Sequence, residues 1–182
     1  MSRPAVFLDR DGTLNVEKGY VHRYSEWVWI PGAIEAIRRV NDAGYLAIVV
    51  SNQAGVARGL YTEAHIAVLH AQVAADAVQS GARIDAFYYC PHHPQFGTVR
   101  DCACRKPGPG MILQAQREHA IDLARSFMIG DKMSDIEAGR AAGVKSLLVS
   151  SGYGAGESAA AGPEVPVLPD VLAAVRYLLD SP

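Results

Sequence analysis

The strongest constraint on this chain is a short apolar run near its N-terminus that leads directly into two aspartates. Residues 4–8 are apolar, and Asp9 and Asp11 follow, two positions apart. Two carboxylates at the mouth of a buried strand repel each other, so ionising both is costly without a cation. Mg²⁺ suits such a place, because it takes oxygen ligands from carboxylates and phosphate groups. Gly12 lets the backbone approach a ligand closely, and the whole pattern predicts a phosphoryl-transfer site with an aspartate nucleophile.

The composition is that of an ordinary globular protein. Of 182 residues, 49% are hydrophobic and 20% are charged, and this length suits a single domain over residues 1–182. The formal net charge of −2 gives no general attraction to nucleic acid or to anionic lipid. We expect no secretory signal, and no apolar stretch approaches the roughly 18 residues that cross a bilayer. We therefore expect a cytoplasmic monomer without nucleic-acid or membrane partners.

Short apolar runs alternate with amphipathic segments, a pattern that predicts an α/β fold with a parallel sheet. We expect strands at 4–8, 45–50, 84–89, 126–129 and 144–149, and helices near 33–40, 62–80, 111–119, 134–142 and 170–179. Thr62 is a candidate N-cap of the second helix. The segment 151–166 is rich in Gly, Ala and Ser, and we expect it to be mobile. No insertion is long enough to form a large cap domain.

Polar side chains follow three of the predicted strands. They are Asp9 and Asp11, then Ser51 and Asn52, then Asp131 and Lys132, and Lys106 lies just before a helix. Parallel strands deliver their carboxyl ends to one edge of the sheet, where ligands bind in such folds. We therefore expect these side chains to form one site.

Each of these residues fits a role in phosphoryl transfer. Asp9 would attack phosphorus and form an aspartyl-phosphate, and Asp11 would act first as acid and then as base. Ser51 and Lys106 would stabilise the phosphoryl oxygens in the transition state. Asp131 would complete the Mg²⁺ site with Asp9 and the backbone carbonyl of Asp11.

Taken singly, these residues also fit structural interpretations. The Asp9–Asp11 pair suits a surface turn, and Ser51-Asn52 after a strand suits a turn as well. Asp131 and Asp135 suit an N-cap followed by a first-turn acid, which the helix dipole favours. Their order along the chain and their places at strand ends favour a common site.

Four ordered segments resemble the motifs of the haloacid dehalogenase (HAD) superfamily. The segments are residues 9–13, 51–53, 106–107 and 130–135. The resemblance implies a Rossmann-like HAD fold, a three-layer sandwich with parallel sheet order 3-2-1-4-5, and Mg²⁺-dependent phosphatase chemistry. Within that superfamily, an aspartate two positions after the nucleophile marks phosphotransferases rather than dehalogenases.

A second group of candidate metal ligands lies in the loop at about 90–106. Its members are Cys90, His92, Cys102 and Cys104. Four sulfur and nitrogen ligands with no open position are typical of structural Zn²⁺, and binding would supply folding free energy that this polar loop cannot obtain from burial. The spacing alone leaves two alternatives open, solvent-exposed thiols and His93 in place of His92. A nucleic-acid-binding zinc module is not favoured, because no basic stripe or recognition helix follows.

Together the segments resemble the family of D-glycero-D-manno-heptose-1,7-bisphosphate 7-phosphatases, with the phosphatase half of bifunctional histidinol-phosphatases. The matching stretches are residues 19–22, 51–55, 90–94 and 102–107. The resemblance implies hydrolysis of the C7 phosphate of a sugar bisphosphate, and it assigns the zinc ligand to His92 rather than His93. The implied substrate-binding residues are Glu17, Lys18, Gly19, Tyr20, Ser51, Asn52, Gln53, Ala54, Arg105, Lys106 and Lys132, with Arg105 on the part that is not cleaved. The alternatives are a histidinol-phosphate phosphatase and a non-catalytic zinc scaffold.

Overall fold

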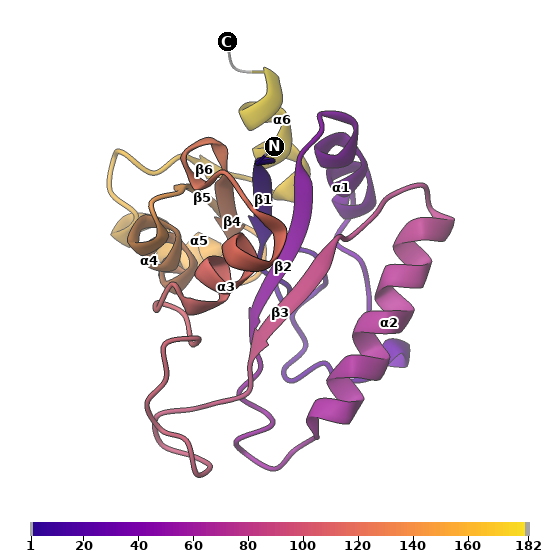
Figure 1. Cartoon of the computed structure of the whole chain (residues 1–182), viewed down its shortest axis with the longest axis vertical. Helices are drawn as coiled ribbons and strands as arrows, with labels where there is room; N and C mark the ends of the chain where they lie inside the picture. The colour runs from indigo at the N-terminus through magenta and orange to yellow at the C-terminus, as the bar shows by residue number, and fades with distance from the viewer. Residues whose placement is uncertain (1, 181–182) are drawn as a thin grey trace.

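Six parallel strands form the centre of the computed structural model, which describes residues 2–180 (Figure 1). The strands are β1 (Ala5–Leu8), β2 (Leu46–Asn52), β3 (Ala86–Cys90), β4 (Phe127–Gly130), β5 (Lys145–Val149) and β6 (Val167–Leu168). Their order is β3-β2-β1-β4-β5-β6, and every neighbouring pair is parallel. The predicted order 3-2-1-4-5 is confirmed, and β6 extends it at one edge. The strand order reverses between β1 and β4, which is where such sheets bind ligands.

Helices cover both faces of this sheet. They are α1 (Ala33–Asp42), α2 (Glu63–Gln79), α3 (Gly110–His119), α4 (Met133–Ala142), α5 (Gly154–Glu157) and α6 (Val171–Asp180), with short 3₁₀ turns at Tyr24–Glu26, Leu123–Arg125 and Ser158–Ala160. Thr62 is the N-cap of α2, as predicted. The N-cap of α4 is Lys132 rather than Asp131.

The packing of the core explains why the strand sequences are continuous apolar runs. Val6 and Leu8 of β1 pack in the layer that contains α1, α2 and α6, whereas Ala5 and Phe7 pack in the layer that contains α3 and α4 (Figure 1). A strand buried on both faces needs apolar side chains at every position. The result is a rigid β1 that ends directly before Asp9.

The segment at 151–166 contains regular structure, namely α5 and the 3₁₀ turn Ser158–Ala160. Ala161 and Val165 pack against Ile136 and Leu148 in a small separate cluster. Its mobility stays a prediction. Within residues 2–180, no helix combines the length and the apolar character that a membrane crossing requires.

Candidate active site

Lys106 lies at the centre of the site, where it joins β1, β2 and α4. Its ammonium group is 2.7 Å from Asp9 Oδ1, 2.8 Å from the Val50 carbonyl oxygen and 2.6 Å from Asp135 Oδ1. Burial opposes the charge of Lys106, but the carboxylates of Asp135 and Asp9 raise the pKa of the side chain above its ordinary value. The cation is therefore kept beside the predicted nucleophile.

Three buried carboxylates, from Asp9, Asp131 and Asp135, meet at the carboxyl ends of β1 and β4. Their oxygens include a set that lies within 4.8 Å of one another. Burial and the charge of Asp9 raise the pKa of Asp131 to about 8 and that of Asp135 to about 6. The Asp131 Oδ2 atom accepts a hydrogen bond of 2.8 Å from the Tyr153 backbone N–H. Within the described chain the buried Oδ1 atom of Asp131 has no hydrogen-bond partner.

The carboxylate of Asp11 has a separate set of partners. Arg10 donates two hydrogen bonds to it, each 3.0 Å long, and Asn15 and Gln53 donate one each, at 3.0 and 3.1 Å. Arg10 is fully buried and also donates to the Val21 carbonyl oxygen at 2.7 Å. The predicted acid/base is thus held in place and tied to the loop at residues 17–22.

Ser51, at the end of β2, is also held by Gln53. The Gln53 Nε2 group donates to Ser51 Oγ at 2.7 Å, and the Tyr61 hydroxyl donates to Gln53 Oε1 at 2.8 Å. Gln53 is 2% exposed, and its amide uses both ends on protein partners. Gln53 thus supports Ser51 and Asp11, and because it also lines the pocket described below, its role in binding substrate stays a prediction.

Asn52 has a similar supporting position. Its amide donates to the Lys106 carbonyl oxygen and accepts from the Lys106 N–H, both at 3.0 Å. Two bonds from one planar side chain fix the backbone that carries the central lysine. Asn52 also lines the pocket described below, and its role in binding substrate stays a prediction.

These groups open into a pocket of about 410 Å³. Several further predicted substrate-binding residues line this pocket. They are Glu17, Gly19, Tyr20, Ala54, Arg105 and Lys132. Lys18 is not among the lining residues, and its ammonium group contacts the Glu26 carbonyl oxygen at 3.2 Å instead. A larger hollow of about 700 Å³ lies against α4, β5 and α6 and contains none of the predicted site residues. The chemistry of the lining therefore selects the smaller pocket.

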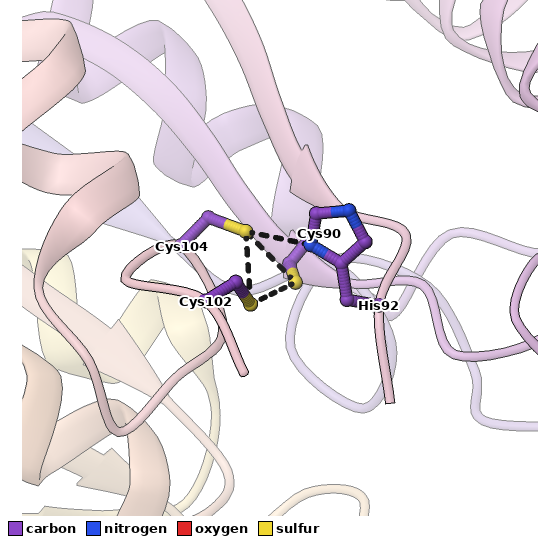
Figure 2. Close-up of side chains that lie close together, drawn as sticks. All are labelled: Cys90, His92, Cys102 and Cys104. Atoms are coloured by element: carbon purple, nitrogen blue, oxygen red, sulfur yellow. Dashed lines mark hydrogen bonds between the residues drawn. The ribbon is translucent and has the colours of Figure 1, made fainter. Parts of the chain in front are cut away.

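The four predicted zinc ligands converge beyond the end of β3 (Figure 2). Ligand atoms of Cys90, His92, Cys102 and Cys104 lie within 4.8 Å of one another. His92 Nδ1 is 3.3 Å from Cys104 Sγ, whereas His93 Nδ1 accepts from the Gln95 backbone N–H at 3.1 Å. Of the two histidines left open by spacing, the structure brings His92 into the cluster. Cys90 is fully buried, so the cluster is attached to the sheet.

Comparisons with known proteins agree with this geometry. An HAD-hydrolase-like family model matches residues 103–174. The chain is 41% identical, over 99% of its length and 90% of the relative's, to D-glycero-beta-D-manno-heptose-1,7-bisphosphate 7-phosphatase of Escherichia coli strain K12. It is 45% identical to the Yersinia pestis protein of the same name, over 83% of this chain and 82% of that one. The chain belongs to the heptose-1,7-bisphosphate 7-phosphatase family.

Solved structures of this family share the fold. The D,D-heptose 1.7-bisphosphate phosphatase from B. bronchiseptica, complexed with magnesium and phosphate, is 34% identical, with a TM-score of 0.88 over 97% of this chain and 98% of that one. The HAD-type fold and the assignment to the HAD hydrolases are therefore confirmed.

The residues at the carboxylate cluster fit the magnesium ion that this family implies. The three buried carboxylates repel one another, and this raises the pKa values of Asp131 and Asp135. Asp131 also presents an oxygen without a hydrogen bond within residues 2–180. Both features suit a hard divalent cation with oxygen ligands. Asp135 belongs to this cluster although it was not among the predicted ligands.

The site also contains side chains for which no catalytic or binding role had been predicted. They are Arg10, Tyr61, Asp135 and Tyr153. Arg10 lies between two motif aspartates directly after a buried strand. A charged side chain is costly to bury unless it is paired, so its position could have indicated an ion pair with one of them. Tyr61 and Tyr153 lie in loops, and no local periodicity or spacing points to them.

Proposed function

We propose that this protein is a Mg²⁺-dependent phosphatase that removes the C7 phosphate of D-glycero-D-manno-heptose 1,7-bisphosphate. The observation that carries the proposal is the convergence of Asp9, Asp11, Ser51 and Lys106 on one polar pocket of about 410 Å³. The names of the relatives, all at 41% identity or more, supply the substrate class.

Phosphoryl transfer begins at Asp9. Lys106 holds the Oδ1 atom of Asp9, which leaves Oδ2 to attack phosphorus while the bond to the C7 oxygen breaks. Asp11 gives a proton to that departing oxygen. A water molecule then attacks phosphorus in the aspartyl-phosphate and loses a proton to Asp11, which frees Asp9 and inorganic phosphate. Ser51 and Lys106 bind the phosphoryl oxygens throughout.

Magnesium would be held by Asp9 and Asp131, with Asp135 beside them and the Asp11 backbone carbonyl as the further predicted ligand. When bound, the ion supplies positive charge that offsets the charge of the phosphoryl group and of the carboxylates. Asp135 accepts hydrogen bonding from the Lys132 N–H at 3.0 Å, and this contact fixes its direction toward Lys106.

A structural zinc ion would occupy the cluster of Cys90, His92, Cys102 and Cys104. Four such ligands suit a closed tetrahedral site. Arg105 and Lys106 follow Cys104 directly, and Arg105 donates to the His92 carbonyl oxygen at 3.0 Å. Fixing the loop therefore fixes the side chains of Arg105 and Lys106. Arg105 would contact the phosphate that is not cleaved.

The test is phosphate release from purified α and β heptose 1,7-bisphosphates, with and without Mg²⁺. We expect Mg²⁺-dependent release of one phosphate per molecule and its loss in Asp9→Asn. A higher kcat/KM for histidinol phosphate would show that the substrate assignment is wrong. Unchanged phosphate release by Asp9→Asn would favour the zinc scaffold over an enzyme.

A further inference from the structure

A chain of hydrogen bonds runs along the wall of the pocket from Tyr61 through Gln53 to both Ser51 and Asp11. The Tyr61 hydroxyl donates to Gln53 Oε1 at 2.8 Å, and the Gln53 Nε2 group donates to Ser51 Oγ at 2.7 Å and to Asp11 Oδ2 at 3.1 Å. Tyr61 is 5% exposed and Gln53 is 2% exposed. One amide thus contacts both the predicted acid/base and the predicted phosphoryl-binding hydroxyl.

The direction of this chain is set where the amide meets Asp11, and Tyr61 completes it at the other end. A phenol has one proton to donate, whereas a glutamine amide has a donor end and an acceptor end that look alike in shape. Burial raises the pKa of Tyr61 to about 12, so the hydroxyl keeps its proton at physiological pH. A carboxylate oxygen only accepts, so the end of the amide that faces Asp11 must be Nε2, which also donates to Ser51. Oε1 then lies at the opposite end, where it accepts the Tyr61 proton.

The same direction decides what Ser51 can do. Its oxygen accepts from Gln53, so its own hydroxyl proton remains for another acceptor, and a phosphoryl oxygen in the pocket is one. A reversed Gln53 would accept that proton through Oε1 and would place an oxygen against the Asp11 carboxylate. Phosphate would then lose a donor, and Asp11 would face a repulsive neighbour.

The position of the Tyr61 ring is itself fixed. A Cβ atom at Gly55 would overlap the ring, so the absence of a side chain there is what lets the ring approach. The His22 ring stacks on the Tyr61 ring, with 4.9 Å between centroids and 9° between planes. These two contacts restrict the ring, and its hydroxyl is directed toward Gln53.

We propose that Tyr61 is a positioning residue for phosphoryl transfer, which acts through Gln53 to keep Ser51 a donor and Asp11 in place. This proposal rests on the proposed phosphatase function. It assigns Tyr61 no contact with the reacting atoms, and it gives Gln53 the role of a connector rather than a substrate ligand.

The test compares Tyr61→Phe, Gln53→Ala and the double variant, all with Mg²⁺ present. Tyr61→Phe keeps the ring and removes the hydroxyl, and we expect kcat to fall about tenfold with KM changed less than about twofold. In the Gln53→Ala background, Tyr61→Phe should lower kcat by less than about twofold, because the amide through which Tyr61 acts is already absent. Tyr89→Phe is the matched control, since the Tyr89 hydroxyl contacts Glu63 at 2.8 Å, outside the pocket, and its kinetics should equal those of the unmodified protein.

Orthovanadate binding, measured by calorimetry, gives a readout without turnover, and Tyr61→Phe should weaken it about tenfold. The proposal is overturned if Tyr61→Phe leaves kcat and vanadate affinity unchanged, if its loss is equally large in the Gln53→Ala background, or if KM rises alone. If the unmodified protein releases no phosphate from the heptose bisphosphate, the proposed function fails, and vanadate binding then decides on Tyr61 separately.

Discussion

Replacing Lys106 by Met tests the electrostatic balance of the site most directly. Met is similar in length, so the change removes the ammonium group and leaves little empty space. It also leaves the buried carboxylates of Asp9 and Asp135 without the cation that lies 2.7 and 2.6 Å from them. Breaking a buried ion pair in this way costs about 3–5 kcal/mol of unfolding free energy. In a chain of this size, we expect Tm to fall by about 6–20 °C.

The loss should depend on pH in a defined direction. Without Mg²⁺, the pKa values of Asp131 (about 8) and Asp135 (about 6) lie above their ordinary value of 3.8. The folded protein therefore binds more protons than the unfolded chain across this interval, so its unfolding free energy falls as pH rises from about 4 to about 8. At pH 5 both Asp131 and Asp135 carry protons. Lys106→Met then removes only the ion pair with Asp9. We expect the penalty of Lys106→Met to shrink there to about 1–3 kcal/mol.

Urea unfolding at pH 5 and pH 8, in buffers freed of divalent ions, measures both numbers. Lys145→Met is the control, because Lys145 is exposed, and it should change stability by less than about 0.5 kcal/mol. Adding Mg²⁺ at pH 8 should stabilise the unmodified protein, since the ion offsets the same carboxylates. An equal penalty at both pH values, or one below about 1 kcal/mol at pH 8, would refute the reasoning.

Three further substitutions test other parts of the site. Asn52→Ala removes both hydrogen bonds to the Lys106 backbone, and we expect unfolding free energy to fall by about 1–3 kcal/mol and kcat by about tenfold, measured by urea unfolding and phosphate release. Cys104→Ser should reduce bound zinc, measured by mass spectrometry of the intact protein, and should lower Tm because the loop loses its metal; retention of one zinc per chain would contradict the ligand assignment. Arg105→Ala should raise KM for the bisphosphate about tenfold or more while leaving KM for a simple aryl phosphate nearly unchanged, and equal effects on both substrates would place Arg105 at the cleaved phosphate instead.

The sequence predicted the fold well because its strong patterns are local. Each of the first five strands is an apolar run, three of them are followed by polar site residues, and their order followed from the resemblance to HAD motifs. β6 was missed because Val167–Leu168 is only two residues long, too short for any periodicity. Its pairing with β5 depends on where the preceding segment packs, and no local pattern specifies that contact.

Most residues of the candidate site were predicted, whereas many of the contacts between their side chains were not. Asp9 and Lys106 were expected together and lie 2.7 Å apart. Asp135 lies in the motif-like segment 130–135, but the only role predicted for it singly was that of a helix-start acid. Its contact with Lys106 depends on how closely α4 approaches β4. The absence of a side chain at Gly130 permits that approach, since a Cβ there would overlap the Asp135 carboxylate. Such close packing between a strand and the helix that follows it appears only once the chain is folded.

The tie from Arg10 to the loop at residues 17–22 has a consequence for how such enzymes diverge. Arg10 reaches the loop through the carbonyl oxygen of Val21, and every amino acid supplies that oxygen. Glu17 and Tyr20, which face the pocket, can therefore be exchanged without removing this anchor. Substitutions of these side chains can change which sugar binds, while the main-chain contact keeps Asp11 in place. New specificities can therefore arise by single substitutions that leave the catalytic residues unchanged.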